Sequence, residues 1–246
     1  MYVAILHFVN QISQFSVNKF IEEKTLLTSN LLFGSIGVLV ETSELQRQSF
    51  NRALTINGID WNWNIGTYCD LLKEPGGKKR LSEYTNNQLS AEKVEQIHID
   101  KQRIFEELIG VGVEPRSGCV EALKKCKDNG GKAGFVTTTT TYTIDIIKKS
   151  LSTHINFEDF DIITSCETVS KPKPSSDIYE YVLSELKIDA AQTIAIEDTK
   201  ANQKAATKSG IRCYLYPGEY SVFNYKDTKD LEFVSDGKML PSFLSD

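Results

Sequence analysis

Long apolar runs, paired cysteines and an excess of positive charge are all missing from this sequence of 246 residues. No run approaches the roughly 18 to 20 apolar residues that cross a bilayer, so we expect no transmembrane segment. The five cysteines are odd in number and show no C-x-x-C spacing, which argues against a disulfide framework or a zinc site and favours a reducing, intracellular compartment. The formal net charge of -5 offers no basic field for a phosphate backbone, so nucleic acid is not an expected partner.

The first stretch of the chain carries no negatively charged side chain. Residues 1–21 contain no Asp, Glu or Arg, and an apolar patch at 2–9 is followed by Gln, Ser and Asn residues. A transit peptide is poor in acids but normally rich in Arg, so that interpretation fits only in part. Alternatively, apolar residues at roughly helical spacing predict an amphipathic helix that packs on the core or on a partner. We therefore treat 1–28 as a transit-like or partner-binding extension, which leaves the cytoplasm, a chloroplast or a mitochondrion open.

What the sequence does contain is an alternation of short apolar runs with helical patterns. The runs have the composition of buried strands and span 31–35, 132–136, 161–165, 193–196 and 212–216. Strands of this kind, separated by helices, predict an α/β fold with a doubly wound parallel sheet.

Between the first two apolar runs the sequence shows helical patterns only, at 43–57, around 68–72, at 91–109 and at 118–129. Such a connection exceeds an ordinary loop, so we expect an all-helical cap domain, residues 44–113, inserted into a core made of 29–43 and 114–246.

The residues that follow the strands are the candidates for a functional site, because open parallel sheets bind ligands at the carboxyl ends of their strands. At the first such end, residues 32–42 read Leu-Phe-Gly-Ser-Ile-Gly-Val-Leu-Val-Glu-Thr. This segment resembles the first motif of the haloacid dehalogenase (HAD) superfamily, hydrophobic-F-D-x-D-G-V-L-V-D/E-T. In such enzymes the first Asp attacks the phosphoryl group and the second protonates the leaving oxygen. This chain has Gly34 and Ile36 at those positions.

The first motif is therefore degenerate. Gly34 has no side chain, and Ile36 can neither donate nor accept a proton, so the nucleophile and the general acid-base group are both missing. Ser35 carries the nearest hydroxyl. In an extended strand, however, its side chain would point to the opposite face from residues 34 and 36.

Three later segments resemble the remaining HAD motifs, in the family's order. Residues 132–138 resemble the second motif, whose hydroxyl binds phosphate, and 173–179 resemble the third, K-P-x-P-D-I-Y, with Ser176 in place of the second proline. Residues 194–199 resemble the fourth motif, an acidic pair that holds Mg²⁺. The helical insertion, with Trp63, Tyr68, Gly-Gly-Lys at 76–78, Lys101 and Phe105, resembles the cap of the CbbY-type sugar-phosphate phosphatases, which are relatives of β-phosphoglucomutase.

This resemblance implies roles for the residues that are retained. The phosphate-binding remnant is Thr137, Thr138 and Lys173, the cap and substrate remnant is Arg116, Lys78 and Arg80, and the weak metal ligands are Asp198 and Glu197. Each set also has an ordinary explanation. The threonine run at 137–141 can cap a helix, the basic residues at 78–80 can form a solvated turn, and His98 and His154 have no second histidine at metal-ligand spacing.

With two carboxylates of the site missing, we expect Lys173 to form a structural ion pair with Asp198 or Glu197. The predicted function is that of a pseudoenzyme, a HAD-fold protein that serves as a binding or scaffolding subunit with protein partners. No cofactor is expected, and Mg²⁺ should bind at most weakly. Two alternatives remain open: a Mg²⁺-dependent sugar-phosphate phosphatase or phosphomutase with an atypical nucleophile, and a sensor that binds a phosphosugar without converting it.

Overall fold

The computed structural model describes residues 30–34, 36–72, 76–86, 88–221 and 232–244, so the expected extension 1–28 lies outside the described residues. Five strands form one sheet, and every pairing in it is parallel. The strands are β1 (Asn30–Phe33), β2 (Ala133–Phe135), β3 (Ile162–Ile163), β4 (Thr193–Glu197) and β5 (Arg212–Leu215). Their order is β3-β2-β1-β4-β5, so β1 is central. The predicted doubly wound parallel sheet is confirmed.

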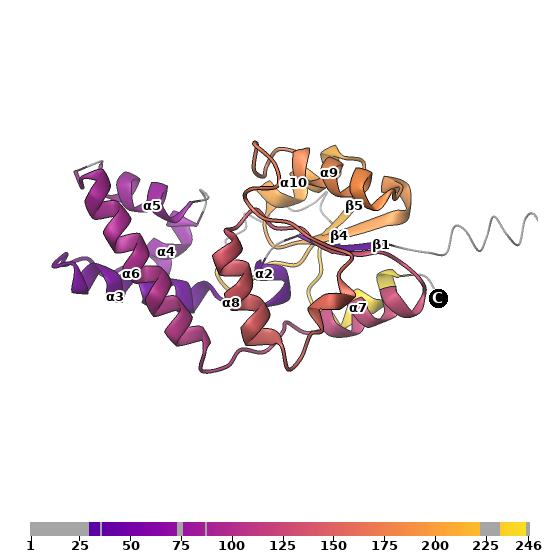
Figure 1. The fold of residues 1–246 in the computed structure, drawn as a ribbon, viewed down its shortest axis with the longest axis horizontal. Helices are drawn as coiled ribbons and strands as arrows, with labels where there is room; N and C mark the ends of the chain where they lie inside the picture. The colour runs from indigo at the N-terminus through magenta and orange to yellow at the C-terminus, as the bar shows by residue number, and fades with distance from the viewer. Residues whose placement is uncertain (1–29, 35, 73–75, 87, 222–231, 245–246) are drawn as a thin grey trace, which may run out of the picture.

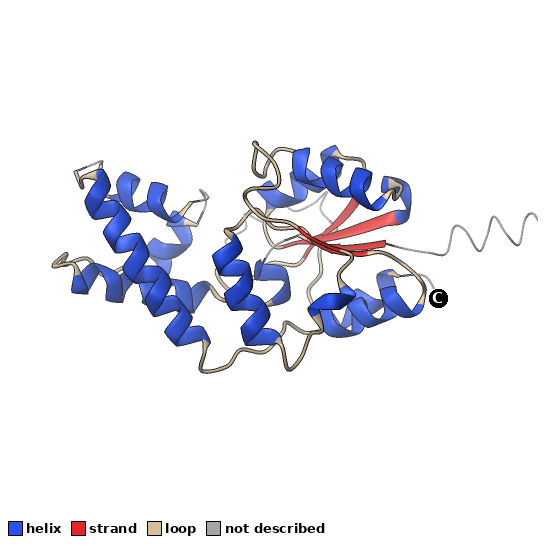
Figure 2. Cartoon of the chain, viewed as in Figure 1, coloured by secondary structure: helices blue, strands red, loops and turns tan. Residues whose placement is uncertain are grey.

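Helices cover both faces of this sheet (Figure 2). One face carries α7 (Cys119–Asp128), α8 (Thr141–Leu151) and η4 (Gly237–Phe243). The other face carries α9 (Asp177–Leu186) and α10 (Lys200–Lys208). The short helices η1 (Phe157–Asp159) and η2 (Ala190–Gln192) lie in the connections. Within β1, Leu31 and Phe33 enter the first core while Leu32 enters the second. Successive strand side chains point to opposite faces, so this run has to be apolar throughout.

Four helices stand apart from the sheet at the other end of the molecule (Figure 1). They are α3 (Ser43–Ile56), α4 (Ile65–Leu71), α5 (Gly77–Tyr84) and α6 (Ala91–Ile109). They bury an aromatic core of their own around Phe50, Trp63 and Tyr68, and we call them the cap. The domain bounds of 44–113 stay a prediction. None of the described helices is long and apolar enough to cross a membrane.

Two local expectations were wrong. The first strand ends at Phe33, and a short helix, α2 (Ile36–Leu39), begins three residues later. The last ladder bond is donated by the N–H of Gly34 to the carbonyl of Ile196. The expected strand through residue 35 is thus shorter than predicted, and the expected direction of the Ser35 side chain lies outside the described residues.

The second wrong expectation concerns the basic turn at 78–80, which belongs to α5. Gly76, at φ 99°, takes a backbone conformation that L side chains rarely adopt and brings the chain into this helix.

Candidate functional site

The loops after the strands meet at one edge of the sheet, with β1 in the middle. Hydrogen bonds hold the strand ends together. The N–H of Gly34 donates to the carbonyl of Ile196 at 2.8 Å, and the N–H of Val136 donates to the carbonyl of Phe33 at 2.7 Å. The structure thereby brings Gly34, Lys173 and Glu197 into one buried cluster. These are positions that the first, third and fourth sequence motifs predicted.

A buried ion pair occupies the centre of this cluster. Lys173 Nζ lies 2.5 Å from Glu197 Oε1, and the two side chains are 3% and 0% exposed. The ammonium also donates to the carbonyls of Gly34 and Val136, and the hydroxyl of Tyr179 donates to Glu197 Oε1 at 2.6 Å. The predicted pairing of Lys173 with Asp198 or Glu197 is confirmed, and the partner is Glu197.

The carboxylate of Glu197 lies in the space that a side chain at position 34 would take. A Cβ built on Gly34 would stand 2.1 Å from Glu197 Cδ and 2.2 Å from its Oε1. The neighbouring acid behaves similarly, because a Cβ on Gly37 would meet Asp198 Oδ2 at 2.3 Å. Both acidic side chains of the fourth motif thus fold against glycines of the first motif.

Burial dominates the electrostatics of this cluster. Loss of hydration raises the pKa of Glu197 even though Lys173 favours its charged form. Burial and the neighbouring Glu197 also raise the pKa of Tyr179 well above its ordinary value. Within the described part of the chain, Glu197 Oε2 has no hydrogen-bond partner. Breaking a buried pair of this kind by removing one partner typically costs about 3 to 5 kcal/mol.

These acids do not fit a Mg²⁺ site. Mg²⁺ requires near-octahedral oxygen ligands and is usually held by one or two free carboxylates. Glu197 is committed to Lys173 and Tyr179, Gly34 offers no side-chain oxygen, and Asp198 Oδ1 accepts from the amide of Asn202 at 3.1 Å. No group of three metal-ligating side chains occurs among the described residues.

The threonine run forms the loop between β2 and α8. Thr137 is buried, and it exchanges two bonds with Thr164: its N–H donates to Thr164 Oγ1 at 3.0 Å, and that hydroxyl donates to its carbonyl at 2.8 Å. Thr140 caps α8 by accepting from the N–H of Thr143. The helix-capping explanation is confirmed for Thr140, whereas phosphate binding by Thr137 and the half-buried Thr138 stays a prediction.

Arg116 is bonded to backbone, and its predicted role as a substrate contact stays a prediction. Its guanidinium donates to the carbonyls of Gly37 at 2.6 Å, Tyr216 at 2.9 Å and Pro217 at 2.6 Å. Its Cζ atom also stacks 3.6 Å from the centre of the Tyr216 ring. The side chain thus ties the segment that leaves the cap to α2 and to the loop after β5.

The two basic residues predicted in the cap have different surroundings. Lys78 is half exposed and pairs with Glu95 at 2.5 Å, as a solvated position would. Arg80 is 9% exposed, donates from Nε to the carbonyl of Leu71 at 2.8 Å and lies 5.6 Å from the centre of the Tyr68 ring. The solvated-turn explanation therefore fails for Arg80, which belongs to the interior of the cap.

The sequence indicated Lys101 only as part of the cap resemblance, and the structure places it in a basic cluster beside Arg80. Lys101 is 6% exposed, lies 5.1 Å from the rings of Phe50 and Phe105 and donates to the amide oxygen of Gln102. Burial, assisted by Arg80, lowers the pKa of Lys101 to about 7. No salt bridge to Lys101 occurs within the described ranges. The sequence named Lys101 and Phe105 together in the cap resemblance, but the burial of Lys101 depends on packing against Phe50 of α3.

His98, expected to be an ordinary surface or boundary residue, lies next to this cluster. Burial and the charges of Lys101 and Lys78 lower the pKa of its imidazole to about 4. A Cβ on Gly77 would stand 3.0 Å from His98 Nε2, so the start of α5 packs closely against the ring. His98 is thus a partly buried boundary residue of the cap, as expected.

Comparison with known proteins gives this arrangement a family. A family model described as haloacid dehalogenase-like hydrolase matches residues 36–216. Protein CbbY of Cereibacter sphaeroides is 31% identical over 217 residues, which cover 87% of this chain and 91% of that protein. The predicted resemblance to HAD proteins of the CbbY type is confirmed.

Solved structures agree with the sequence relatives. CbbY from Rhodobacter sphaeroides in complex with phosphate superposes with a TM-score of 0.76 at 28% identity, covering 86% of this chain and 96% of that chain. A mutant of the same protein in complex with Xylulose-(1,5)bisphosphate gives a TM-score of 0.75, again at 28% identity and over 85% and 95% of the two chains. A putative β-phosphoglucomutase from Thermotoga maritima, at 22% identity and a TM-score of 0.67 over 87% and 98%, shares the fold.

Proposed function

Because this chain belongs to the haloacid dehalogenase-like hydrolases, we propose that it keeps the fold of the family without its phosphoryl-transfer chemistry. In this proposal it is a pseudoenzyme that serves as a binding or scaffolding subunit for protein partners. Fold alone does not define function, so the proposal depends on the residues at the strand ends. Its cellular compartment stays a prediction.

The observation that carries the proposal is the position of Glu197. Transfer through an acyl-phosphate requires a carboxylate that a substrate phosphorus can approach in line. Gly34 supplies none, and the nearby Glu197 is fully buried and bonded to Lys173 and Tyr179. Lys173, a cation that would otherwise stabilise phosphate oxygens, is neutralised by the same contact. Ile36, at the start of α2, replaces the general acid-base group.

The cap favours one further candidate, a phosphosugar sensor. Charged side chains are rarely buried without a partner, yet Lys101 takes no salt bridge within the described residues. A phosphate ester bound beside Lys101 and His98 would supply the missing negative charge. The mutant CbbY in complex with Xylulose-(1,5)bisphosphate makes that bisphosphate the first ligand to test.

The test is phosphate release from phosphosugars, including xylulose-1,5-bisphosphate, with and without Mg²⁺. We expect none above the buffer rate. Turnover of about 1 s⁻¹ or more that survives repurification and changes in an Asp198→Asn variant would refute the pseudoenzyme proposal and favour the phosphatase with an atypical nucleophile.

Calorimetry with the same bisphosphate separates the two non-catalytic roles. A sensor binds it and loses affinity in Lys101→Met, while Lys124→Met, at an exposed site on α7, binds as wild type does. A scaffold releases no heat in any of these titrations. Affinity purification from the native source then identifies the protein partners.

A further inference from the structure

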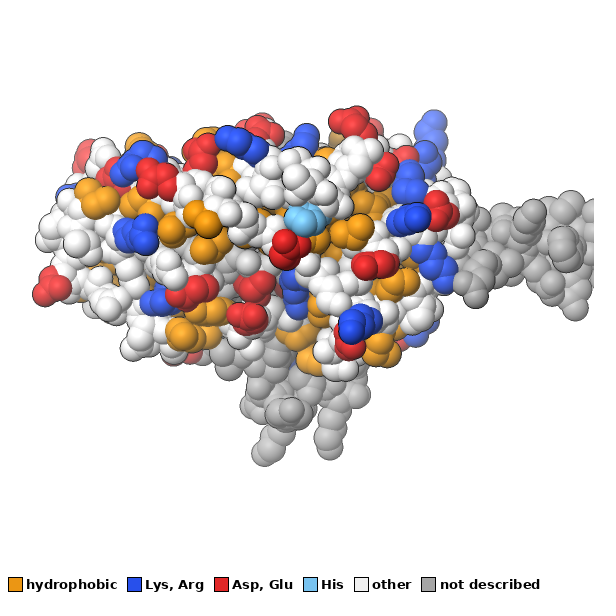
Figure 3. Space-filling view, turned by 90° about the horizontal axis from the view of Figure 1, so that it is seen from below, with side chains coloured by type: hydrophobic (Ala, Val, Ile, Leu, Met, Phe, Trp, Pro, Cys, Tyr) orange, Lys and Arg blue, Asp and Glu red, His pale blue; other side chains and the backbone are white. Residues whose placement is uncertain are grey.

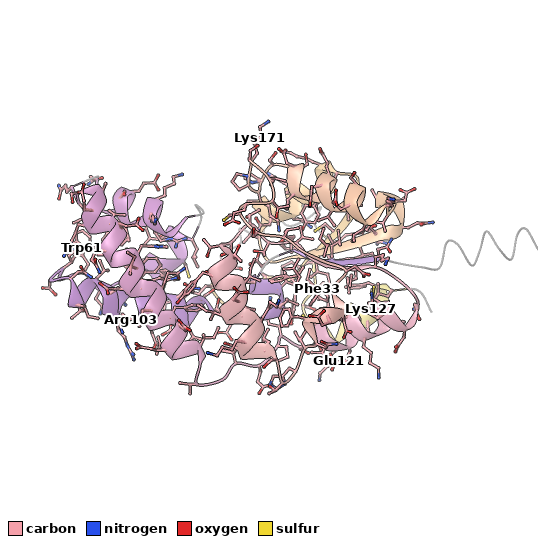
Figure 4. The ribbon with its side chains drawn as sticks, in the orientation of Figure 1. Phe33, Trp61, Arg103, Glu121, Lys127 and Lys171 are labelled. Atoms are coloured by element: carbon pink, nitrogen blue, oxygen red, sulfur yellow. The ribbon has the colours of Figure 1, made fainter. Side chains whose placement is uncertain are left out.

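A cleft of about 660 Å³ opens on the cap surface between α3, α6 and the chain at 60–62. It is lined by residues of these three segments: Asn51, Arg52, Thr55, Ile56, Asp60, Trp61, Asn62, Arg103, Ile104 and Glu107. Figure 4 places Trp61 and Arg103 at the cap end of the molecule, away from the sheet. None of these residues belongs to the buried cluster at the strand ends.

Apolar side chains in and beside this cleft are unusually accessible. Ile56 is 60% exposed and Tyr84 is 39% exposed. The half-buried Trp61 ring packs edge-on against Tyr84 with centroids 5.4 Å apart. Rigid aromatic residues lose little conformational entropy on binding and are enriched, together with Arg, in the energetically important parts of protein interfaces.

The charges of the cleft divide into a paired and an unpaired set. Arg103 and Glu107 neutralise each other at 2.6 Å. Arg52 and Asp60 are both exposed and line the same cleft, but neither takes a salt bridge within the described part of the chain. Figure 3 shows charges of both signs interspersed with apolar side chains over the cap end. Among the residues that the structure describes, the cleft thus presents an unpaired cation and an unpaired anion beside an aromatic surface.

We propose that this cleft is the interface of a homodimer, and that its occupant is the cap of a second copy. In a twofold-symmetric interface the same patch meets itself. Each contact between two different residues therefore occurs twice, once from each copy to the other. A patch whose Arg and Asp form no salt bridge with any described residue suits this arrangement, because Arg52 of each copy faces Asp60 of the other. The inference is independent of the proposed function, since an active enzyme could dimerise in the same way.

Charge reversal tests the pairing. We expect the full chain to dimerise in a concentration series by sedimentation equilibrium. Arg52→Glu places two acids opposite each other at each contact, and Asp60→Arg places two arginines there, so each variant alone should weaken the dimer by at least about tenfold. An equimolar mixture of the two variants should form a heterodimer. In that heterodimer the acid introduced at position 52 of one copy meets the arginine introduced at position 60 of the other, while the second contact keeps its native pair.

Matched controls and a second readout complete the experiment. Lys124→Glu on α7 and Asp145→Arg on α8 reverse exposed charges outside the cleft and should leave the dimer unchanged. The chain has two tryptophans, and Trp63 is fully buried, so the emission maximum should shift to the blue with concentration as Trp61 is covered. A chain that stays monomeric overturns the proposal. A dimer that ignores both reversals, or a mixture that fails to restore association, overturns it as well.

Discussion

Gly34→Ala is expected to destabilise this protein, against the usual effect of such a change. Replacing Gly by Ala at a compatible site typically stabilises a protein by about 0.4 to 1 kcal/mol, because the unfolded chain loses freedom. Here the new Cβ would lie 2.1 Å from Glu197 Cδ, far inside van der Waals contact. Glu197 would have to move, although it is fully buried and bonded to Lys173 and Tyr179.

The size of the effect follows from those contacts. Overpacking a core costs about 1 to 3 kcal/mol, and disrupting a buried ion pair costs about 3 to 5 kcal/mol. We therefore expect the free energy of unfolding to fall by about 2 to 5 kcal/mol. For a chain of this length, 1 kcal/mol changes the melting temperature by about 2 to 4 °C, which gives a loss of roughly 4 to 20 °C in thermal unfolding.

A matched control and a second background isolate the cause. Gly66→Ala in α4 places its Cβ no closer than 3.4 Å to Asn64 Oδ1 and should be neutral or stabilising. In a Lys173→Met, Glu197→Ala background the pair is removed and the space beside Gly34 is empty, so Gly34→Ala should cost little there. An equal cost in both backgrounds, or no cost in the wild-type chain, would show that Glu197 does not occupy the site of the missing side chain.

The imidazole of His98 has a pKa of about 4 in the folded chain, against 6.5 as its ordinary value. The unfolded state therefore binds a proton first, so the stability associated with neutral His98 is present above about pH 6.5 and is lost as the pH falls towards 4. Because the ring is only partly buried, we expect this loss to be about 1 to 2 kcal/mol. Denaturant unfolding at several pH values should show that the free energy of unfolding depends less on pH in His98→Gln than in wild type. Tyr220, from the loop after β5, packs on Tyr68 of the cap with centroids 6.1 Å apart and donates to Glu44. Tyr220→Ala should speed amide hydrogen exchange in α3 and α4, while Tyr220→Phe keeps the ring and should change exchange much less; equal exchange in wild type and Tyr220→Ala would mean that this contact does not fix the cap.

The sequence by itself determined the local elements and their order. Five apolar runs became the five parallel strands, and the helical pattern over 91–109 became α6 with the same bounds, because hydrophobic periodicity is a local signal. The ends of parallel strands meet at one edge of a sheet, so the pairing of Lys173 with an acid of the fourth motif was also predictable. Gly34 and Ile36 were visible as the positions where the family's first motif departs from its pattern.

Only the tertiary structure decided how the side chains around these positions are used. The sequence predicted a first strand over 31–35 and left the basic residues at 78–80 as a substrate contact or a solvated turn. The strand β1 ends at Phe33, and packing against Phe50 and Tyr68 buries Arg80. Arg116 is bonded to carbonyls 79 to 101 residues away, and Glu197 lies beside Gly34 from a different strand. Contacts between segments this far apart depend on the volume and direction of many side chains at once, and no local pattern in the chain encodes them.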